Sequence, residues 1–124
     1  MELLRQQLIA YRPWNEQEER DREELLRRLD SHEDLYTRAN TAAHFTASAW
    51  VVSPDRKQVL MAYHRLYDSW AWLGGHADGE CELLPVAIRE VREESSLCDV
   101  RPARAEPVSL EVLWVPEHVK RGQF

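Results

Sequence analysis

Three glutamates near residue 90 are the side chains in this sequence that are best placed to do chemistry. On a helical wheel, Glu94 lies ~40° from Glu90 on one side and Glu93 ~60° on the other, so the three carboxylates share one face of the expected helix. Like charges at these spacings destabilise a helix by roughly 0.2–0.5 kcal/mol per pair. A hard cation such as Mg²⁺ relieves the repulsion, because it binds carboxylate oxygens together with substrate phosphates. An apolar stripe follows the opposite face: Leu84, Ala87, Ile88 and Val91.

Glycines and tryptophans precede this helix. Gly74, Gly75 and Gly79 are three of the four glycines in the chain, and they predict a turn whose backbone approaches a ligand closely. Trp70 and Trp72 flank that turn, where they either stack a nucleobase or pack against the core and cover its edge.

Two further side chains near the turn have chemistry of their own. His76 is a candidate for substrate binding, and a histidine beside a loop is also an ordinary hydrogen-bonding residue. Cys81 lies among acidic residues, so we do not expect it to be a nucleophile, which requires a neighbouring base or cationic site.

The stretch from Gly74 to Leu97 resembles the Nudix box, whose pattern is G-x5-E-x7-R-E-U-x-E-E-x-G-U with U a bulky aliphatic residue. Gly75 takes the first position, residues 89–94 fill R-E-U-x-E-E, and Leu97 takes the last position. Two positions depart from the pattern: Cys81 stands where the first glutamate belongs and Ser96 where the late glycine belongs. If that position needs a positive φ, a serine there costs roughly 1 kcal/mol.

The resemblance implies a fold and a mechanism. The fold would be α/β (α+β), a Nudix-like α/β/α sandwich with a mixed sheet. The activity would be metal-dependent hydrolysis of a pyrophosphate bond in a nucleoside diphosphate linked to another moiety. By resemblance, Glu90 and Glu94 would hold Mg²⁺ or Mn²⁺, Glu93 would be a further ligand or the base that activates water, the Gly75 carbonyl would complete the coordination, and Arg89 would orient a glutamate.

Other functions remain open at this point. If the departures at Cys81 and Ser96 disable the box, the chain would instead be a catalytically weak or inactive protein, or a fragment, that binds a nucleotide or a partner. It would be an unrelated protein with a solvated acidic helix if no metal binds at all.

Composition narrows the class of protein. The chain has 124 residues and a net charge of −6, which argues against non-specific nucleic-acid binding. No apolar run approaches the ~20 residues of a membrane span, and the first residues do not resemble a signal peptide. With two cysteines and no disulfide framework, we expect a cytoplasmic protein.

The order of elements predicts a single domain over residues 1–124. We expect residues 1–40 to form a helical N-terminal extension and residues 41–124 to form a sheet with the box helix. The C-terminal part of this second region is expected to be missing. We therefore expect a truncated chain or a homodimer that completes the sheet. Tyr63 is expected in the core. The expected helices are 1–11, 16–30 capped by Asn15, and a short one opened at Ser31 and ending at Arg38; the expected strands are 44–53, 58–66, 69–73 and 105–115.

Overall fold

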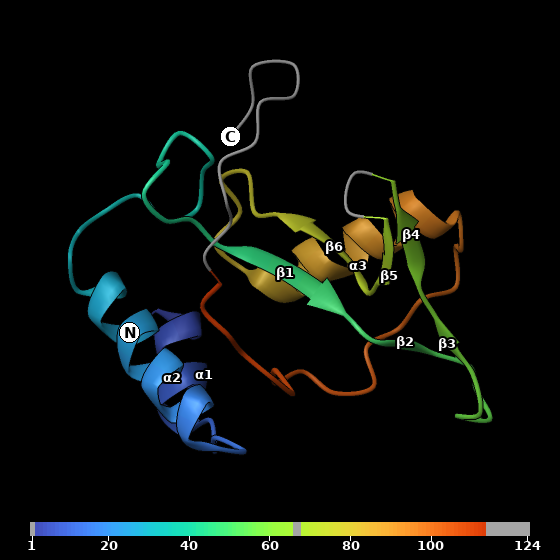
Figure 1. The fold of residues 1–124 in the computed structure, drawn as a ribbon, viewed down its shortest axis with the longest axis horizontal. Coiled ribbons are helices and arrows are strands. Elements are labelled where there is room, and N and C mark those ends of the chain that lie inside the picture. Colours follow the sequence, from blue (N-terminus) through green and yellow to red (C-terminus); the bar gives the residue numbers. More distant parts are fainter. Residues whose placement is uncertain (1, 66–67, 114–124) are drawn as a thin grey trace.

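The computed structural model describes residues 2–65 and 68–113. This part of the chain is a small mixed α/β protein with three helices and small antiparallel sheets (Figure 1). None of these helices has the length and hydropathy that a membrane span requires. The helices are α1 (Leu3–Ala10), α2 (Glu16–Leu29) and α3 (Leu83–Ser95), and the strands are β1 (Thr46–Ala49), β2 (Val51–Val52), β3 (Val59–Leu60), β4 (Ala62–His64), β5 (Ser69–Ala71) and β6 (Leu73–His76).

The strands fall into three extended segments, each of which changes partner half-way. β1 pairs with β6, β2 with β3 and β4 with β5, all antiparallel. The predicted strands 44–53, 58–66 and 69–73 were therefore wrong as continuous elements: they are interrupted at Trp50, Met61 and Trp72, where the ladder passes to another neighbour. No parallel pair occurs among the described strands, so the mixed sheet of the predicted sandwich is not seen there.

The two glycines expected in a turn lie in a strand instead. Gly74 and Gly75 belong to β6, where they pair with Ser48 and Ala47 of β1. Only the third glycine, Gly79, has a positive φ, at 92°, in the loop that leads to α3. The predicted turn is thus part of a strand, in which Gly75 leaves room for Glu90 of α3 and Gly74 lies closely against Ser48 of β1.

The core is small and centres on α3. The helix packs against β1 and β6, and Val86 and Val91 are its most deeply buried side chains. Val86 was not part of the predicted apolar stripe, whereas Leu84 and Ile88 were and are only half-buried. The buried hydrophobic residues among those described are Leu4, Leu8, Leu35, Leu73, Ala77, Val86, Ala87 and Val91.

The N-terminal helices form a hairpin at one end of the molecule (Figure 1). Asn15 begins α2 as predicted, because its side chain accepts a hydrogen bond from the Glu18 amide at 2.9 Å. Arg22 of α2 donates to the Tyr11 carbonyl at 2.8 Å and so links the two helices. Leu4 and Leu8 of α1 are buried, which gives the hairpin an apolar seam.

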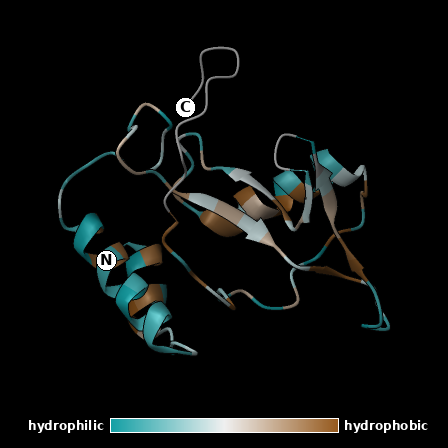
Figure 2. Cartoon of the chain, in the orientation of Figure 1, coloured by the Kyte–Doolittle hydropathy of each residue, from teal (hydrophilic) through white to brown (hydrophobic). Residues whose placement is uncertain are grey.

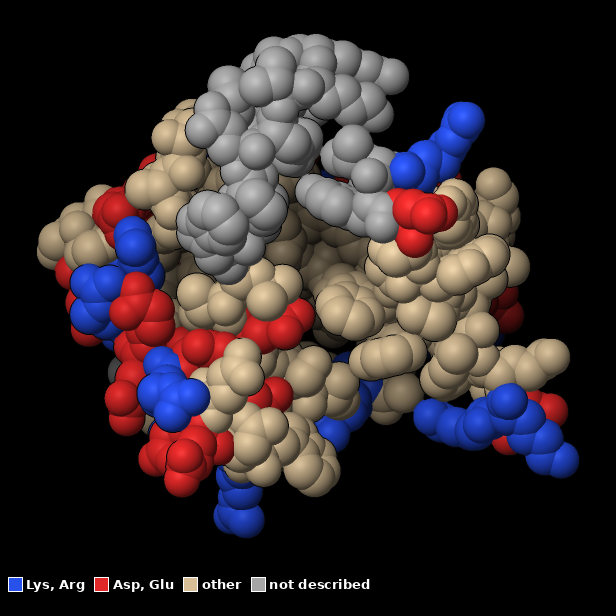
Figure 3. All heavy atoms as spheres, in the orientation of Figure 1, with Lys and Arg blue, Asp and Glu red and all other residues tan. Residues whose placement is uncertain are grey.

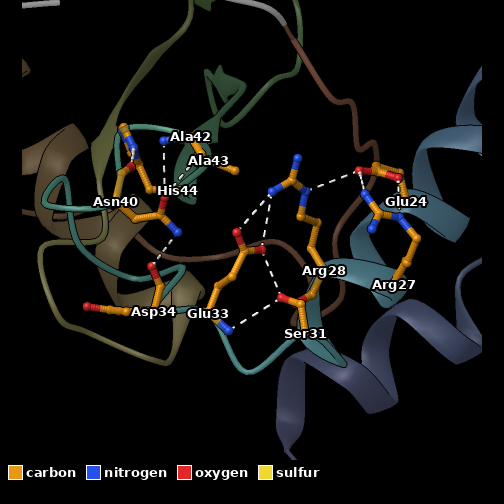
Figure 4. A network of polar contacts seen from close by, with 10 residues as sticks. All are labelled: Glu24, Arg27, Arg28, Ser31, Glu33, Asp34, Asn40, Ala42, Ala43 and His44. Atoms are coloured by element: carbon orange, nitrogen blue, oxygen red, sulfur yellow. Dashed lines mark hydrogen bonds and ion pairs between the residues drawn. The ribbon is translucent and has the colours of Figure 1, made fainter.

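The short helix predicted after Ser31 is absent; residues 31–45 form an irregular loop. Side chains in this loop bond to the backbone and to one another instead of leaving the backbone to a helix (Figure 4). The Ser31 hydroxyl donates to the Arg28 carbonyl at 2.6 Å, and Arg28 pairs with Glu33 at 3.1 Å. Asn40 donates to the Asp34 carbonyl at 2.9 Å.

The strand predicted for residues 105–115 is also absent over its described part, which ends at Leu113. The backbone there bonds to side chains of the N-terminal hairpin rather than to another strand. The Val108 carbonyl accepts from Tyr11 at 3.2 Å and from Trp14 at 3.1 Å. The Val112 amide donates to Asp21 of α2 at 3.2 Å. Residues 114 and 115 lie outside the described part.

Many large apolar side chains are exposed. Figure 2 shows hydrophobic residues along β2 and β3, at the end of the molecule opposite α1 and α2. The prediction that Tyr63 lies in the core was wrong, because that side chain is 47% exposed. Trp70 and Trp72 are exposed as well, so they do not pack into the core. The core forms where α3 packs against β1 and β6, whereas Tyr63 and Trp70 lie in β4 and β5.

Candidate functional site: the contact of α3 with β6

The buried residues of α3 decide which of its glutamates face the sheet. On a helical wheel, the buried residues of α3 define a mean direction. Glu94 points in nearly that direction, Glu90 points ~40° away from it and Glu93 points ~100° away from it. Glu90 and Glu94 therefore sit on the side of α3 that packs against β6. Glu93 lies outside that side, and this divides the three carboxylates that the sequence placed on one face.

Glu90 lies directly over Gly75. A Cβ added at Gly75 would come within 2.4 Å of Glu90 Oε1 and 2.5 Å of its Cδ, so the carboxylate occupies the space that the glycine leaves. The Glu90 side chain is 18% exposed. The first glycine of the predicted box is thus explained by close approach: no other residue lets this carboxylate lie against the strand.

Glu94 reaches the neighbouring residue of the same strand. Its Oε1 accepts a hydrogen bond from the Gly74 amide at 3.1 Å. Glu90 and Glu94, one helical turn apart, therefore both place their carboxylates against the Gly74–Gly75 backbone. The helical wheel predicted that these two carboxylates lie on one side of the helix, and both of them also contact strand β6.

Arg89 joins the helix to the end of β6. Its Nη2 donates to the His76 carbonyl at 3.1 Å and lies 3.5 Å from Glu90 Oε1. The guanidinium thus contacts the carboxylate over Gly75 and offsets part of its charge. The arginine therefore contacts both the strand end and the glutamate, and the orienting role that the resemblance implies for it stays a prediction.

Glu93 lies on an open, outward part of the helix. It lines a hollow on the surface of α3 with Pro85, Ile88, Arg89 and Arg92. Its carboxylate is exposed to water. The structure therefore does not bring Glu93 together with the carboxylates of Glu90 and Glu94 against β6.

His76 lies among charged groups at the end of β6. Its ring centroid is 5.1 Å from that of His44, and Arg38 and Asp78 form an ion pair nearby, at 2.9 Å. Burial lowers the pKa of His76, with further contributions from Arg38 and His44, while Asp78 and Glu90 oppose the shift. Its Nδ1 is buried and has no hydrogen-bond partner among the described residues.

This cluster was not foreseen as a whole. Arg38 and Asp78 are 40 positions apart, and nothing in the sequence indicates that they pair. The Asp78 pKa is lowered by its hydrogen bond with Arg38. His44 was given no role, and only the pairing of β1 with β6 brings it beside His76.

Trp70 and Trp72 are not brought together with the carboxylates. Along β6, Leu73 is buried and Gly75 faces Glu90, so these alternate residues face α3. Trp72, one position away, therefore belongs to the other face. Trp70 contacts Tyr63 in a tilted arrangement with ring centroids 5.5 Å apart, and Trp72 contacts Trp50 in the same way at 5.9 Å.

The two departures from the box pattern lie at the ends of the helix region. Cys81 is exposed in the loop before α3 and forms no disulfide. Ser96 ends the helix with a φ of 63°, in the left-handed conformation for which the pattern has glycine. Its amide still donates to the Arg92 carbonyl at 3.0 Å, so the helix end forms despite the unfavourable residue.

A divalent cation needs several oxygen ligands, of which the protein has to supply at least one or two. Within residues 2–65 and 68–113, no three or more His, Cys, Asp or Glu side chains are grouped so as to hold a metal ion. Glu90 and Glu94 form a pair of oxygen donors, and Mg²⁺ is usually bound by one or two carboxylates together with waters and substrate phosphates. The pair therefore fits a cation that a phosphate substrate helps to hold.

Comparisons with known proteins add no assignment: neither a scan against protein-family models nor a search of curated proteins finds a match to this chain.

Proposed function

We propose that this chain hydrolyses a pyrophosphate bond in a nucleoside diphosphate linked to another moiety, as a Nudix-type enzyme with an α/β/α fold. The observation that carries the proposal is the placement of Glu90 and Glu94 against the Gly74–Gly75 backbone. A solvated acidic helix would not need a glycine under one glutamate and an amide bonded to another.

The residues of this site have separable tasks. Glu90 and Glu94 would hold Mg²⁺ or Mn²⁺, which when bound supplies charge neutralisation of the phosphates and a more acidic water. Arg89 keeps Glu90 in place through its contacts with that carboxylate and with the His76 carbonyl. The Gly75 carbonyl remains the proposed backbone ligand.

Glu93 had two expected roles, a metal ligand or a base. Its position favours the base, because an exposed carboxylate outside the Glu90–Glu94 pair is open to a water molecule. In that role Glu93 accepts a proton as the water oxygen attacks phosphorus. The phosphate on the other side of the broken bond leaves with the bridging oxygen.

The substrate beyond its pyrophosphate is not assigned. Trp70 and Trp72 face away from α3, so base stacking on them requires a substrate that reaches around the edge of the strands. His76 is nearer, since its carbonyl bonds to Arg89, and it is the better candidate of the three for a substrate contact.

Hydrolysis by purified protein tests the proposal. A panel of sugar nucleotides, dinucleotides and nucleoside triphosphates is incubated with Mg²⁺ or Mn²⁺, and the phosphorus products are followed by ³¹P NMR. We expect cleavage that Glu90→Gln and Glu94→Gln abolish and that Glu23→Gln, at an exposed position of α2, leaves unchanged. Cleavage that survives in both box variants contradicts the assignment.

A second candidate is a nucleotide-binding chain without turnover. It is favoured by one observation, that Cys81 stands exposed where the pattern has a carboxylate. Metal-dependent binding of a nucleoside diphosphate by calorimetry, lost in Glu90→Gln, with no product in the ³¹P spectrum, would select this candidate over the enzyme.

A further inference from the structure

Six apolar residues form a closed ring on one face of the strands. Tyr63 pairs with Trp70 across β4 and β5, and Val52 pairs with Val59 across β2 and β3. Directly opposite residues point to the same face, as do residues two apart along a segment. Following these relations around the three segments, with Met61 as the step between Val59 and Tyr63, returns to the starting residue without conflict; Met61 itself is half-buried and is not counted in the ring. The ring consists of Trp50, Val52, Val59, Tyr63, Trp70 and Trp72.

This apolar ring lies on the face opposite α3. Leu73 and Gly75, which alternate with Trp72, face the helix: the first is buried and the second is covered by Glu90. Every member of the apolar ring, by contrast, is between 41% and 67% exposed. The helix α3 packs against one face of β1 and β6, and the described residues place no other helix or strand over the apolar ring.

The apolar ring carries no charged residue, and charges lie at its rim. Figure 3 shows uncharged residues over the region of β2 to β5 and charged ones at the β2–β3 turn and over the N-terminal helices. The β2–β3 turn contains Asp55, Arg56 and Lys57. At the other rim, the Tyr63 hydroxyl donates to Asp68. An uncharged centre with a rim of both signs is the layout of a protein–protein interface.

The exposed area is sufficient for one side of such an interface. An aromatic side chain presents roughly 150–250 Å², so the four exposed rings leave roughly 300–500 Å² accessible, to which the two valines add. A standard interface buries about 800 Å² per partner, of which about 450–500 Å² is apolar. The apolar ring thus matches the apolar part of one partner.

We propose that the apolar ring is the interface of a homodimer, in which the same face of a second copy covers it. A second copy carries an equal uncharged centre and a rim with both signs of charge. A twofold axis through the ring places each apolar ring on the other and closes the assembly, so that no further copy can add. The proposal does not depend on the proposed catalytic activity.

Sedimentation velocity of the whole 124-residue chain, from about 1 to 100 µM, tests the proposal. We expect a concentration-dependent species of twice the 14.6 kDa monomer mass. Trp70→Arg and Val59→Arg, each placing a charge on the apolar ring, should shift the midpoint to at least ~10-fold higher concentration, since an unpaired charge in an apolar interface is costly. Ile9→Arg is the matched control, because Ile9 is 54% exposed but lies in α1.

The outcomes are distinct. Dimer formation by the parent chain and the Ile9 variant, together with monomeric, folded Trp70 or Val59 variants, supports the proposal; circular dichroism checks the fold. A parent chain that stays monomeric at 100 µM overturns it. So does a dimer that both ring variants leave intact, or one that the Ile9 variant disrupts equally. Open-ended oligomers overturn the closed twofold arrangement.

Discussion

Replacing Gly75 by alanine perturbs the candidate site by a single methyl group. The new Cβ would lie 2.4 Å from Glu90 Oε1, 2.5 Å from its Cδ and 3.0 Å from its Cγ. To regain van der Waals distance the carboxylate has to move by roughly 1 Å. The strand itself has no reason to shift, because the clash is with the end of a flexible side chain.

The expected effect on stability is small and that on activity is large. Overpacking typically costs about 1–3 kcal/mol, and a movable carboxylate places Gly75→Ala at the lower end. A displacement of about 1 Å at a catalytic group lowers the rate roughly 10²-fold. We therefore expect kcat/KM to fall by about two orders of magnitude while the melting temperature falls by only a few degrees.

Gly79→Ala is the matched control for this experiment. Gly79 has a φ of 92° and no atom within 4 Å of a built Cβ, so an alanine there is strained by about 1–3 kcal/mol without touching Glu90. Both variants are assayed for hydrolysis at saturating Mg²⁺ beside chemical denaturation curves. If Gly75→Ala keeps kcat/KM within twofold of the parent, or if Gly79→Ala loses as much activity as Gly75→Ala, then activity does not depend on the position of Glu90 against the strand.

Three further predictions follow from the helix end and the histidine cluster. Ser96→Gly should raise the free energy of unfolding by about 1 kcal/mol, measured in urea, because the left-handed φ of 63° no longer carries a side-chain penalty. The pKa of His76 is lower in the folded protein than in the unfolded chain. Its contribution to the free energy of unfolding is therefore present above pH 6.5 and is lost as the pH falls below 6.5. His76→Gln should therefore flatten the decline of stability below pH 6.5, whereas His32→Asn, at an exposed residue, should not. Arg38→Met should raise the pKa of His76, followed by NMR of the ring protons, because the guanidinium helps to keep that pKa low; an unchanged pKa would leave burial and His44 as the causes of the shift.

Local signals predicted the helices well. Asn15 is where α2 begins, and the run of strong helix formers ends within a residue of the predicted position. The helix α3 contains the three glutamates and the apolar stripe that were expected on one helix, and Ser96 has the positive φ at which its cost was foreseen. These features depend on neighbours within one turn of the chain, which the sequence displays directly.

The strands and the loop after α2 were predicted less well, because their conformation depends on contacts with other parts of the chain. Nothing near Trp50 or Met61 reveals that the ladder changes neighbour there. Residues 105–113 have a strand-like pattern, yet their backbone bonds to side chains about 90 positions away, such as Glu18 and Asp21. Side-chain bonds in the Ser31 loop similarly replace the predicted helix.

The candidate site was predicted in part. The wheel placed Glu90 and Glu94 correctly on one side of α3, but it could not show that the packing direction of Val86 leaves Glu93 outside. The role of Gly75 follows from its contact with Glu90, which joins residues 15 positions apart and requires the strand to lie under the helix.

A thermal melt with and without millimolar Mg²⁺ or Mn²⁺ tests the central claim, a divalent site at Glu90 and Glu94, most directly. A ligand present at about 100 times its Kd stabilises the folded state by about 2.7 kcal/mol, which corresponds to a rise of roughly 10 °C in the melting temperature of a chain of this size. We predict that rise for the parent chain and for Glu23→Gln, and its loss in the double variant Glu90→Gln, Glu94→Gln. A cooperative melt that ignores the cation in all three proteins, or a rise that the double variant retains, contradicts the assignment.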